Sequence, residues 1–184
     1  MNGMHYSETI QLKNGKSCEL RNAEAADASA FLAYFMQCHG ETDYLTTYPD
    51  ETEHDLEKVA ARLQVSADSD TDIEILAFVD GKLAGSAGIN KLRDRDKLRH
   101  RAEFGISILR EYWGLGIGTA LTQACIDCAR QAGFLQLELE AVSENHSAIR
   151  LYAKHGFTEY GRNPKGFRNR AGNWQELVLM RLEL

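Results

Sequence analysis

Three glycines crowd the junction between an apolar run and a helix-like segment. Gly114, Gly116 and Gly118 fall within the stretch EYWGLGIGTA, which follows FGISIL and precedes TALTQACIDCARQAG. Because glycine destabilises a helix, its repetition at a helix start indicates a backbone that must stay bare. A strand that turns there into a helix gathers free amide N–H groups at the positive end of the helix dipole. The junction is therefore predicted to bind an anion such as phosphate.

Two common phosphate-binding patterns do not fit this junction. A Walker loop needs a lysine after its last glycine, but Thr119 and Ala120 follow Gly118. A dinucleotide fingerprint, GxGxxG, counted from Gly116 needs a glycine where Leu121 stands. That fingerprint should also open a βαβ unit, whereas here the glycines follow a run of hairpins. A dinucleotide-binding oxidoreductase is kept as an alternative.

The remaining sequence alternates hairpin and helix patterns. Asn14-Gly15 and Asp80-Gly81 are turn signals between apolar runs, and the first predicts an N-terminal hairpin over about 8–20. Periods near 3.6 predict helices over 27–38, 55–65, 117–132 and 145–155. Further strands are predicted over 73–89, 103–109, 135–142, 157–162 and 174–184. This order predicts an α/β fold with a mixed, mostly antiparallel sheet of about seven strands and about four helices.

Length and composition favour a single globular domain. The 184 residues are 43% apolar, which predicts a single domain over 1–184 with its core over about 18–184. The net charge of −6 argues against a nucleic-acid partner. No segment has the apolar length of a signal peptide or a membrane span, so we expect no membrane association and a cytoplasmic location.

The CxxC pair does not indicate a metal site. Cys125 and Cys128 continue the apolar helical face of Ile117, Leu121 and Ala124, which predicts that both thiols pack in the core. A zinc site would need two further ligands at matching spacing, and none is present. No metal is expected.

Two blocks of the sequence resemble the GNAT superfamily of acyl-CoA-dependent N-acetyltransferases. WGLGIG, from Trp113 to Gly118, matches the family's [QR]xxGx[GA] motif, with Trp113 in place of the usual Gln or Arg. EAVSENHSAIRLYAKHGF, from Glu140 to Phe157, matches a strand followed by N-x-x-A-x-x-[LF]-Y-x-x-x-G-F. The predicted order of strands and helices is also that of the family.

The resemblance implies that acetyl-CoA is the cosubstrate and that the glycine turn holds its pyrophosphate. A backbone amide of the strand ending in Ile106-Ser107-Ile108 is expected to hold the thioester carbonyl, and that strand aligns the pantetheine arm. Asn145 is expected to contact the arm, to cap its helix, or both. The full set of expected cofactor-binding residues is Ile106, Ser107, Ile108, Trp113, Gly114, Leu115, Gly116, Ile117, Gly118, Thr119, Asn145 and Tyr152.

The resemblance also implies which residues are catalytic. Tyr152 falls where the family has its general acid, and Glu103 or Glu140 would serve as the base, directly or through water. The implied activity is acetyl transfer to a primary amine of a small molecule or protein N-terminus by direct attack in a ternary complex. A catalytically idle acyl-CoA sensor is the alternative. The acceptor is expected between residues 39–55 and 163–174, and a homodimer is left open.

Overall fold

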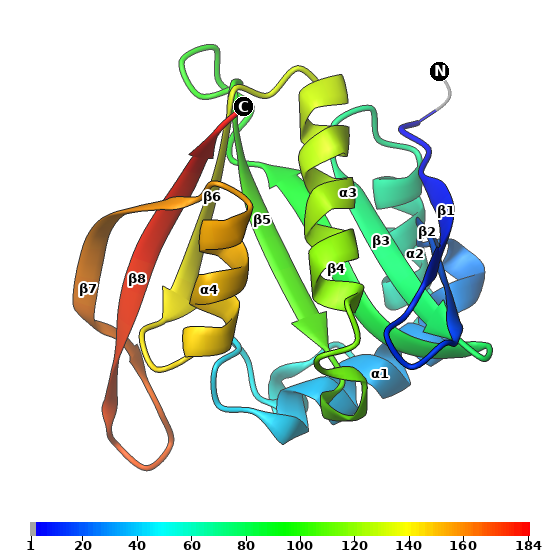
Figure 1. Cartoon of the computed structure of the whole chain (residues 1–184), viewed down its shortest axis with the longest axis horizontal. Coiled ribbons are helices and arrows are strands. Elements are labelled where there is room, and N and C mark those ends of the chain that lie inside the picture. The colour runs from blue at the N-terminus through cyan, green and yellow to red at the C-terminus, as the bar shows by residue number, and fades with distance from the viewer. Residues whose placement is uncertain (1–2) are drawn as a thin grey trace.

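In the described part of the chain, eight strands form one sheet through the centre of the molecule, in the order β1-β2-β3-β4-β5-β6-β8-β7 (Figure 1). The structure is a computed structural model and describes residues 3–184, so the first two residues of the predicted domain lie outside it. The strands are β1 Ser7–Gln11, β2 Ser17–Asn22, β3 Ile73–Val79, β4 Lys82–Lys91, β5 Arg101–Ile108, β6 Gln136–Val142, β7 Thr158–Arg168 and β8 Trp174–Glu183. Every neighbouring pair is antiparallel except β5 and β6, which confirms the predicted mixed sheet with one strand more than the approximate count.

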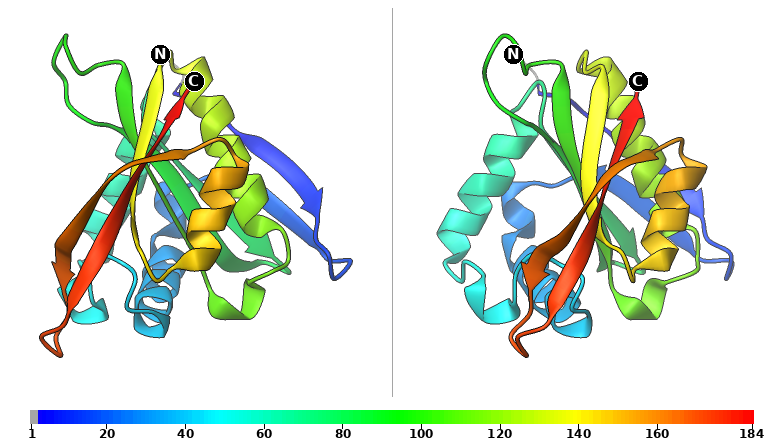
Figure 2. Two further views of the ribbon diagram at one scale, coloured as in Figure 1. Left: turned by 60° about the vertical axis from the view of Figure 1, so that its left-hand side comes forward. Right: turned by 90° about the vertical axis from the view of Figure 1, so that its left-hand side faces the viewer.

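Within residues 3–184, four α-helices cover the two faces of the sheet. They are α1 Ala28–Glu41, α2 Leu56–Ala67, α3 Ile117–Gln131 and α4 His146–Lys154. Figure 2 shows α1 and α2 on one face, with α3 and α4 on the other. None of the helices in residues 3–184 has the length and apolar character needed to cross a membrane.

Tight turns set the register of the N-terminal half. Gly15 and Gly81 have φ of +83° and +77°, conformations that glycine adopts without strain. Asp80 also has a positive φ, of +50°, so the Asp80-Gly81 pair joins β3 to β4 as the sequence predicted.

The two layers of helices bury separate apolar clusters. On the α3 face, Leu121, Cys125 and Cys128 are buried, with Cys125 fully so, and pack against β3, β4 and β5. This confirms the prediction that the CxxC thiols lie in the core. On the other face, Phe31 of α1 and Leu63 of α2 pack against Leu76 of β3.

Three local details differ from the sequence-based predictions. Asp27 does not cap α1 through its side chain; it forms a two-pronged ion pair with Arg21, with both N–O distances 2.8 Å. Leu135 lies just before the start of β6 and is exposed, unlike Leu137 and Leu139. Much of the loop expected over 163–174 is strand, since β7 runs to Arg168 with register shifts on either side of Arg162.

Candidate active site

The site begins where β5 and β6 separate. Their parallel pairing covers only Arg101 to Glu103 on β5 and Gln136 to Glu138 on β6. Beyond this point β5 continues to Ile108, while β6 continues to Val142 and pairs with β8 alone. The edge of β5 that faces β6 is therefore left without a neighbouring strand over its last five residues. Its backbone groups there can pair with an extended ligand.

The glycine turn lies at the end of this opening and leads into α3. Gly114 and Gly116 have φ of +73° and +103°, and a Cβ on either would meet no atom within 4 Å. Gly116 is the N-cap of α3 and provides no side-chain cap, so the first amide N–H groups of the helix have no side-chain acceptor from that residue. Such a bare turn with open space above it fits a phosphate group.

Gly118 is small for a different reason. A Cβ there would stand 3.2 Å from Leu151 Cδ2 and 3.4 Å from Ile108 Cδ1. Its lack of a side chain therefore lets the first turn of α3 approach α4 and the end of β5. The three glycines thus have two roles, since two adopt positive φ and one allows close packing.

A pocket of about 470 Å³ connects the glycine turn with the β5–β6 opening. Eleven of the twelve expected cofactor-binding residues line it: Ile106, Ser107, Ile108, Trp113, Gly114, Gly116, Ile117, Gly118, Thr119, Asn145 and Tyr152. Leu115 does not; its side chain packs against the core, and its carbonyl accepts a hydrogen bond from the Lys13 amide at 3.1 Å. We call this cavity the cofactor pocket.

Trp113, which stands where the family usually has Gln or Arg, makes a hydrogen bond through its indole ring. Its indole Nε1 donates a hydrogen bond to the carbonyl oxygen of Ile108 at 2.8 Å. The Arg110 guanidinium carbon lies 5.5 Å from the Trp113 ring centroid. The indole thereby joins the glycine turn to the end of β5 and also lines the pocket.

Tyr152 and Asn145 enter the cofactor pocket from α4. Asn145 caps this helix, because its side-chain oxygen accepts a hydrogen bond from the Ala148 amide at 3.3 Å, as the sequence predicted. Tyr152 is buried, with its ring edge-on to Phe104 at a centroid distance of 6.0 Å. Burial raises the pKa of the Tyr152 phenol well above its usual value, so the hydroxyl is protonated at neutral pH.

The two predicted base candidates lie outside both pockets of the site. Glu103 and Glu140 are exposed and line neither cavity. Glu103 on β5 lies opposite Asn90 on β4, and Asn90 lines the second cavity described below. Glu140 lies on β6 beyond the point where the strands separate. The structure therefore brings Glu103 to the border of the site and leaves Glu140 on the neighbouring strand.

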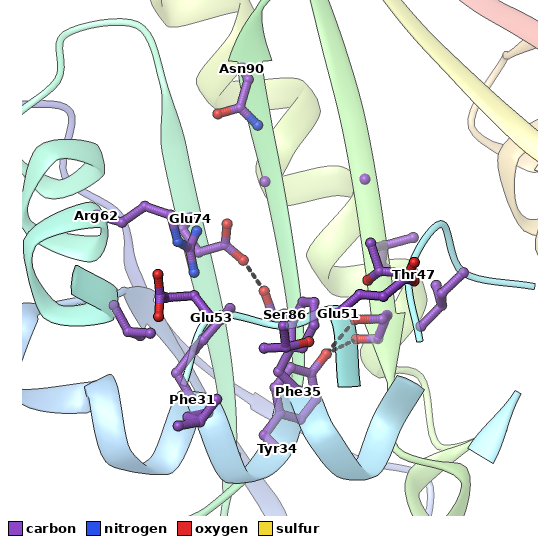
Figure 3. Close-up of a pocket in the computed structure, with 18 residues that line it drawn as sticks. Phe31, Tyr34, Phe35, Thr47, Glu51, Glu53, Arg62, Glu74, Ser86 and Asn90 are labelled. Carbon is purple, nitrogen blue, oxygen red and sulfur yellow. Dashed lines mark hydrogen bonds between the residues drawn. The ribbon is translucent and has the colours of Figure 1, made fainter. Parts of the chain in front are cut away.

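A second pocket, of about 440 Å³, opens on the opposite face of the sheet beneath α1 and α2 (Figure 3). Its floor includes Gly88 and Gly105, which lie directly opposite each other on β4 and β5. Leu45, Ile106 and Ser107 line both this pocket and the cofactor pocket. The two cavities therefore meet at the end of β5. We call the second cavity the acceptor pocket.

A tyrosine from α1 fixes this meeting point. The hydroxyl of Tyr34 lies 2.7 Å from the carbonyl oxygen of Ser107 and 2.6 Å from its Oγ. Burial raises the pKa of Tyr34 well above its usual value, so it remains a hydrogen-bond donor. Tyr34 thus fixes the stretch of β5 shared by the two pockets.

Several of the lining side chains were not identified from the sequence. Lys13 reaches the cofactor pocket from the β1–β2 turn, and Glu74 and Arg62 line the acceptor pocket. Glu74 had a detectable signal, because it is the one charged residue within the apolar strand Ile73–Val79. Lys13 and Arg62 had none, since each is one of many exposed basic residues in the sequence.

Two loops expected to flank the acceptor are bonded to each other. Arg170 Nη2 lies 2.7 Å from Asp50 Oδ1, and the Arg170 amide donates to the Tyr48 hydroxyl at 3.0 Å. Asp43 also receives a hydrogen bond from Asn169 at 3.2 Å. The tip of the β7–β8 hairpin thus joins the α1–α2 connection beside the acceptor pocket.

Comparison with known proteins identifies the family to which this architecture belongs. The sequence profile of the Acetyltransferase (GNAT) family matches residues 32–157. The chain belongs to the GNAT acetyltransferase family. The matched range includes the glycine turn, Tyr152 and most of both pockets. The predicted resemblance is therefore confirmed, and the dinucleotide oxidoreductase alternative is set aside.

Full-length relatives agree with this assignment. An L-methionine sulfoximine/L-methionine sulfone acetyltransferase of Pseudomonas aeruginosa is 28% identical over 91% of this chain and 95% of its own. The crystal structure of a GNAT acetyltransferase from Streptococcus pneumoniae superposes with a TM-score of 0.87 at 31% identity, covering 91% of this chain and 99% of that one. The structure of yncA, a putative acetyltransferase from Salmonella typhimurium with its cofactor acetyl-CoA, has a TM-score of 0.74 at 25% identity, covering 91% and 94%.

As a GNAT enzyme, the protein is an N-acetyltransferase that uses acetyl-CoA. The residues present fit this cosubstrate, because open space lies above Gly114 and Gly116 where a phosphate needs room. When bound, acetyl-CoA supplies an activated acetyl thioester. The GNAT-type glycine turn and β5 edge are the parts of the chain suited to hold its diphosphate and its arm.

Proposed function

We propose that this GNAT enzyme acetylates the primary amine of a small, amino-acid-like molecule. The observation that carries the proposal is the meeting of the two pockets at Ile106 and Ser107, one open to each face of the sheet. An amine in the acceptor pocket and a thioester held along β5 would meet there without crossing the sheet. This arrangement suits direct attack in a ternary complex, because both reactants are positioned at once.

The size of the acceptor pocket favours a small molecule over a protein N-terminus. The hydrogen bonds of Arg170 and Asn169 to the α1–α2 connection narrow the approach that a polypeptide would need. The P. aeruginosa relative is named for two amino-acid derivatives, methionine sulfoximine and methionine sulfone, and spans nearly the whole chain. Both considerations support an amino-acid-like acceptor.

Tyr152 is proposed as the general acid. It lines the cofactor pocket from α4 and keeps its proton at neutral pH, because burial raises its pKa. A protonated phenol beside the departing sulfur can donate its proton to the thiolate. Asn145, about two helical turns before Tyr152, both caps α4 and lines the same pocket.

Glu103 or Glu140 is proposed as the group that accepts the proton of the amine, acting through water. Both lie on the sheet face that the acceptor pocket opens to, and Glu103 is the nearer in register to the pocket residue Asn90. Glu103→Gln and Glu140→Gln distinguish them. The variant that lacks the base should lose its activity over the lower part of the pH range, while the other keeps the wild-type profile. Two wild-type profiles would remove both residues from this role.

The function is tested by thiol release from acetyl-CoA across a panel of amines. The panel contains L-amino acids, methionine sulfone, simple alkylamines and a peptide with a free N-terminus. We expect release with amino acids and with methionine sulfone, and little with the peptide. Tight coenzyme A binding with no thiol release for any amine would instead indicate the acyl-CoA sensor.

A further inference from the structure

Two opposite charges line the acceptor pocket without bonding to each other. Glu74 projects from β3 and Arg62 from α2, and both reach into the same end of the cavity (Figure 3). Neither takes part in an ion pair with any residue in the described range 3–184. Burial raises the pKa of Glu74 above its usual value, and the positive charge of Arg62 is close enough to offset part of that rise.

Each of the two side chains has a neutral neighbour. One carboxylate oxygen of Glu74 accepts a hydrogen bond from the Ser86 hydroxyl, and the other lies 3.0 Å from the point where a Cβ on Gly88 would stand. The Arg62 guanidinium carbon lies 5.0 Å from the centroid of the Phe31 ring. Glu74 is therefore oriented by a hydrogen bond, Arg62 lies beside Phe31 while remaining exposed, and both retain capacity for a charged ligand.

The other two acidic residues that line the pocket, Glu51 and Glu53, are exposed, whereas Glu74 is partly buried. Glu51 accepts a hydrogen bond from the Tyr48 amide at 2.7 Å. Glu53 accepts one from the Asp55 amide at 2.9 Å and one from Lys58 Nζ at 3.2 Å. Glu74 has one neutral donor, and burial raises its pKa because desolvation disfavours the charged carboxylate. A bound ammonium would satisfy it.

The position of Glu74 places such an ammonium next to the reaction centre. Its carboxylate lies over β4, where Ser86 is directly opposite Ser107 of β5. Neighbouring strands are about 4.8 Å apart, so the carboxylate is roughly one strand spacing from the segment shared by the two pockets. Arg62, on α2, approaches the same end of the pocket from the side opposite the sheet.

We propose that Glu74 and Arg62 together bind the zwitterionic end of a free α-amino acid. The α-ammonium pairs with Glu74 and faces β5, and the α-carboxylate pairs with Arg62. The side chain then lies against the apolar wall formed by Leu32, Phe35 and Leu45. The inference rests on the proposed function and narrows it, because a simple amine or a peptide N-terminus has no free α-carboxylate for Arg62.

The test compares each amino acid with its α-carboxamide, which keeps the amine and lacks the carboxylate. The wild type should prefer the acid in kcat/KM by roughly two- to fivefold, the range for an ion pair with an exposed arginine. Arg62→Gln should abolish this preference. Arg130→Gln, which removes an exposed arginine of α3 far from the pocket, is the matched control and should retain it.

Glu74→Gln should behave differently. It should raise the KM of the acid and of the amide alike, because both carry the ammonium, and leave the ratio between them unchanged. Glu57→Gln, on the exposed surface of α2, is its control and should match the wild type. The Kd of coenzyme A, measured for every variant, should equal that of the wild type and so verifies an intact fold.

Three results would overturn the inference. The first is equal use of acid and amide by the wild type, and the second is an acid preference that survives Arg62→Gln. In either case amino-acid acetylation still stands. The third is acetylation of other amines with none of any amino acid, which removes both the inference and the proposed acceptor class.

Discussion

Replacing Gly116 by alanine is the sharpest perturbation that the glycine turn allows. At φ of +103° and ψ of −2°, an L-residue pays about 1–2 kcal/mol for the left-handed conformation. For a chain of 184 residues this corresponds to a Tm lower by roughly 2–8 °C. The added methyl group meets no protein atom within 4 Å, so the packing itself is not disturbed.

The same substitution should weaken coenzyme A binding. The methyl group projects into the space assigned to phosphate, and relaxation of the strained backbone would move the first amides of α3. Each hydrogen bond lost between an amide and a charged phosphate costs about 1.5–3 kcal/mol, or roughly 10- to 150-fold in Kd. Titration calorimetry with coenzyme A measures the Kd, and thermal denaturation measures the Tm of the same sample.

Gly118→Ala is the matched control, because it adds the same methyl two residues later at an ordinary helical φ. Its Cβ contacts the mobile end of Leu151 at 3.2 Å, which needs to shift by only a few tenths of an ångström. We expect coenzyme A affinity within a few-fold of the wild type. Wild-type affinity in Gly116→Ala, with its Tm lowered as calculated, would refute the assignment of this turn to phosphate.

Three further predictions concern single side chains. Tyr152→Phe should lower kcat, measured by thiol release, by about 10²-fold or more. The Kd of coenzyme A, measured by calorimetry, should stay within about twofold of the wild type. An unchanged kcat would remove the proposed role of Tyr152 as general acid. Lys13→Gln should weaken coenzyme A binding about two- to fivefold at low salt, because Lys13 lines the pocket and an exposed ion pair is weak. The loss should shrink as salt is raised, since salt screens the pair, and a salt-independent loss would contradict the electrostatic origin. Asp27→Asn should destabilise the fold by about 1–3 kcal/mol at neutral pH, because the hydrogen bonds from Arg21 lower the pKa of Asp27 below its usual 3.8. That stabilisation is present above the usual pKa of 3.8 and is lost as pH falls through the lower pKa of the folded state. The two proteins should therefore converge in acid denaturation curves, and a constant gap would argue against this origin.

The cofactor side of the site could be predicted from sequence because its determinants are local. Gly114 and Gly116 adopt positive φ within one turn, and Asn145 caps the helix that carries Tyr152. Each of these features depends on neighbours within a few residues. A contiguous motif therefore contains nearly all the information that fixes this half of the site.

The acceptor side could not be predicted in the same way. Its pocket is lined by residues of α1, α2, β3, β4 and β5. The hydrogen bond from Ser86 to Glu74 forms only because the register of β3 and β4 brings the two side chains together. The bonds between Arg170 and the α1–α2 connection likewise join residues more than a hundred positions apart. Sequence patterns indicate that each element exists, but not which polar side chains converge once the sheet has formed.

A similar reason explains the local differences in secondary structure. Asp27 has the residue type and position of a helix cap, yet the nearby Arg21 on β2 offers it two hydrogen bonds in a partly buried setting. In β7, Phe167 and Arg168 pair with Gln175 and Trp174 and extend a strand past Pro164. Tertiary partners decide both outcomes.

A crystal structure of the protein with coenzyme A tests the central claim most directly. The account predicts that the diphosphate lies against the backbone amides from Gly116 to Thr119, with the thiol at Ile106 and Ser107 beside Tyr152. A coenzyme bound on the other face of the sheet, or with its diphosphate away from the glycine turn, would contradict the account.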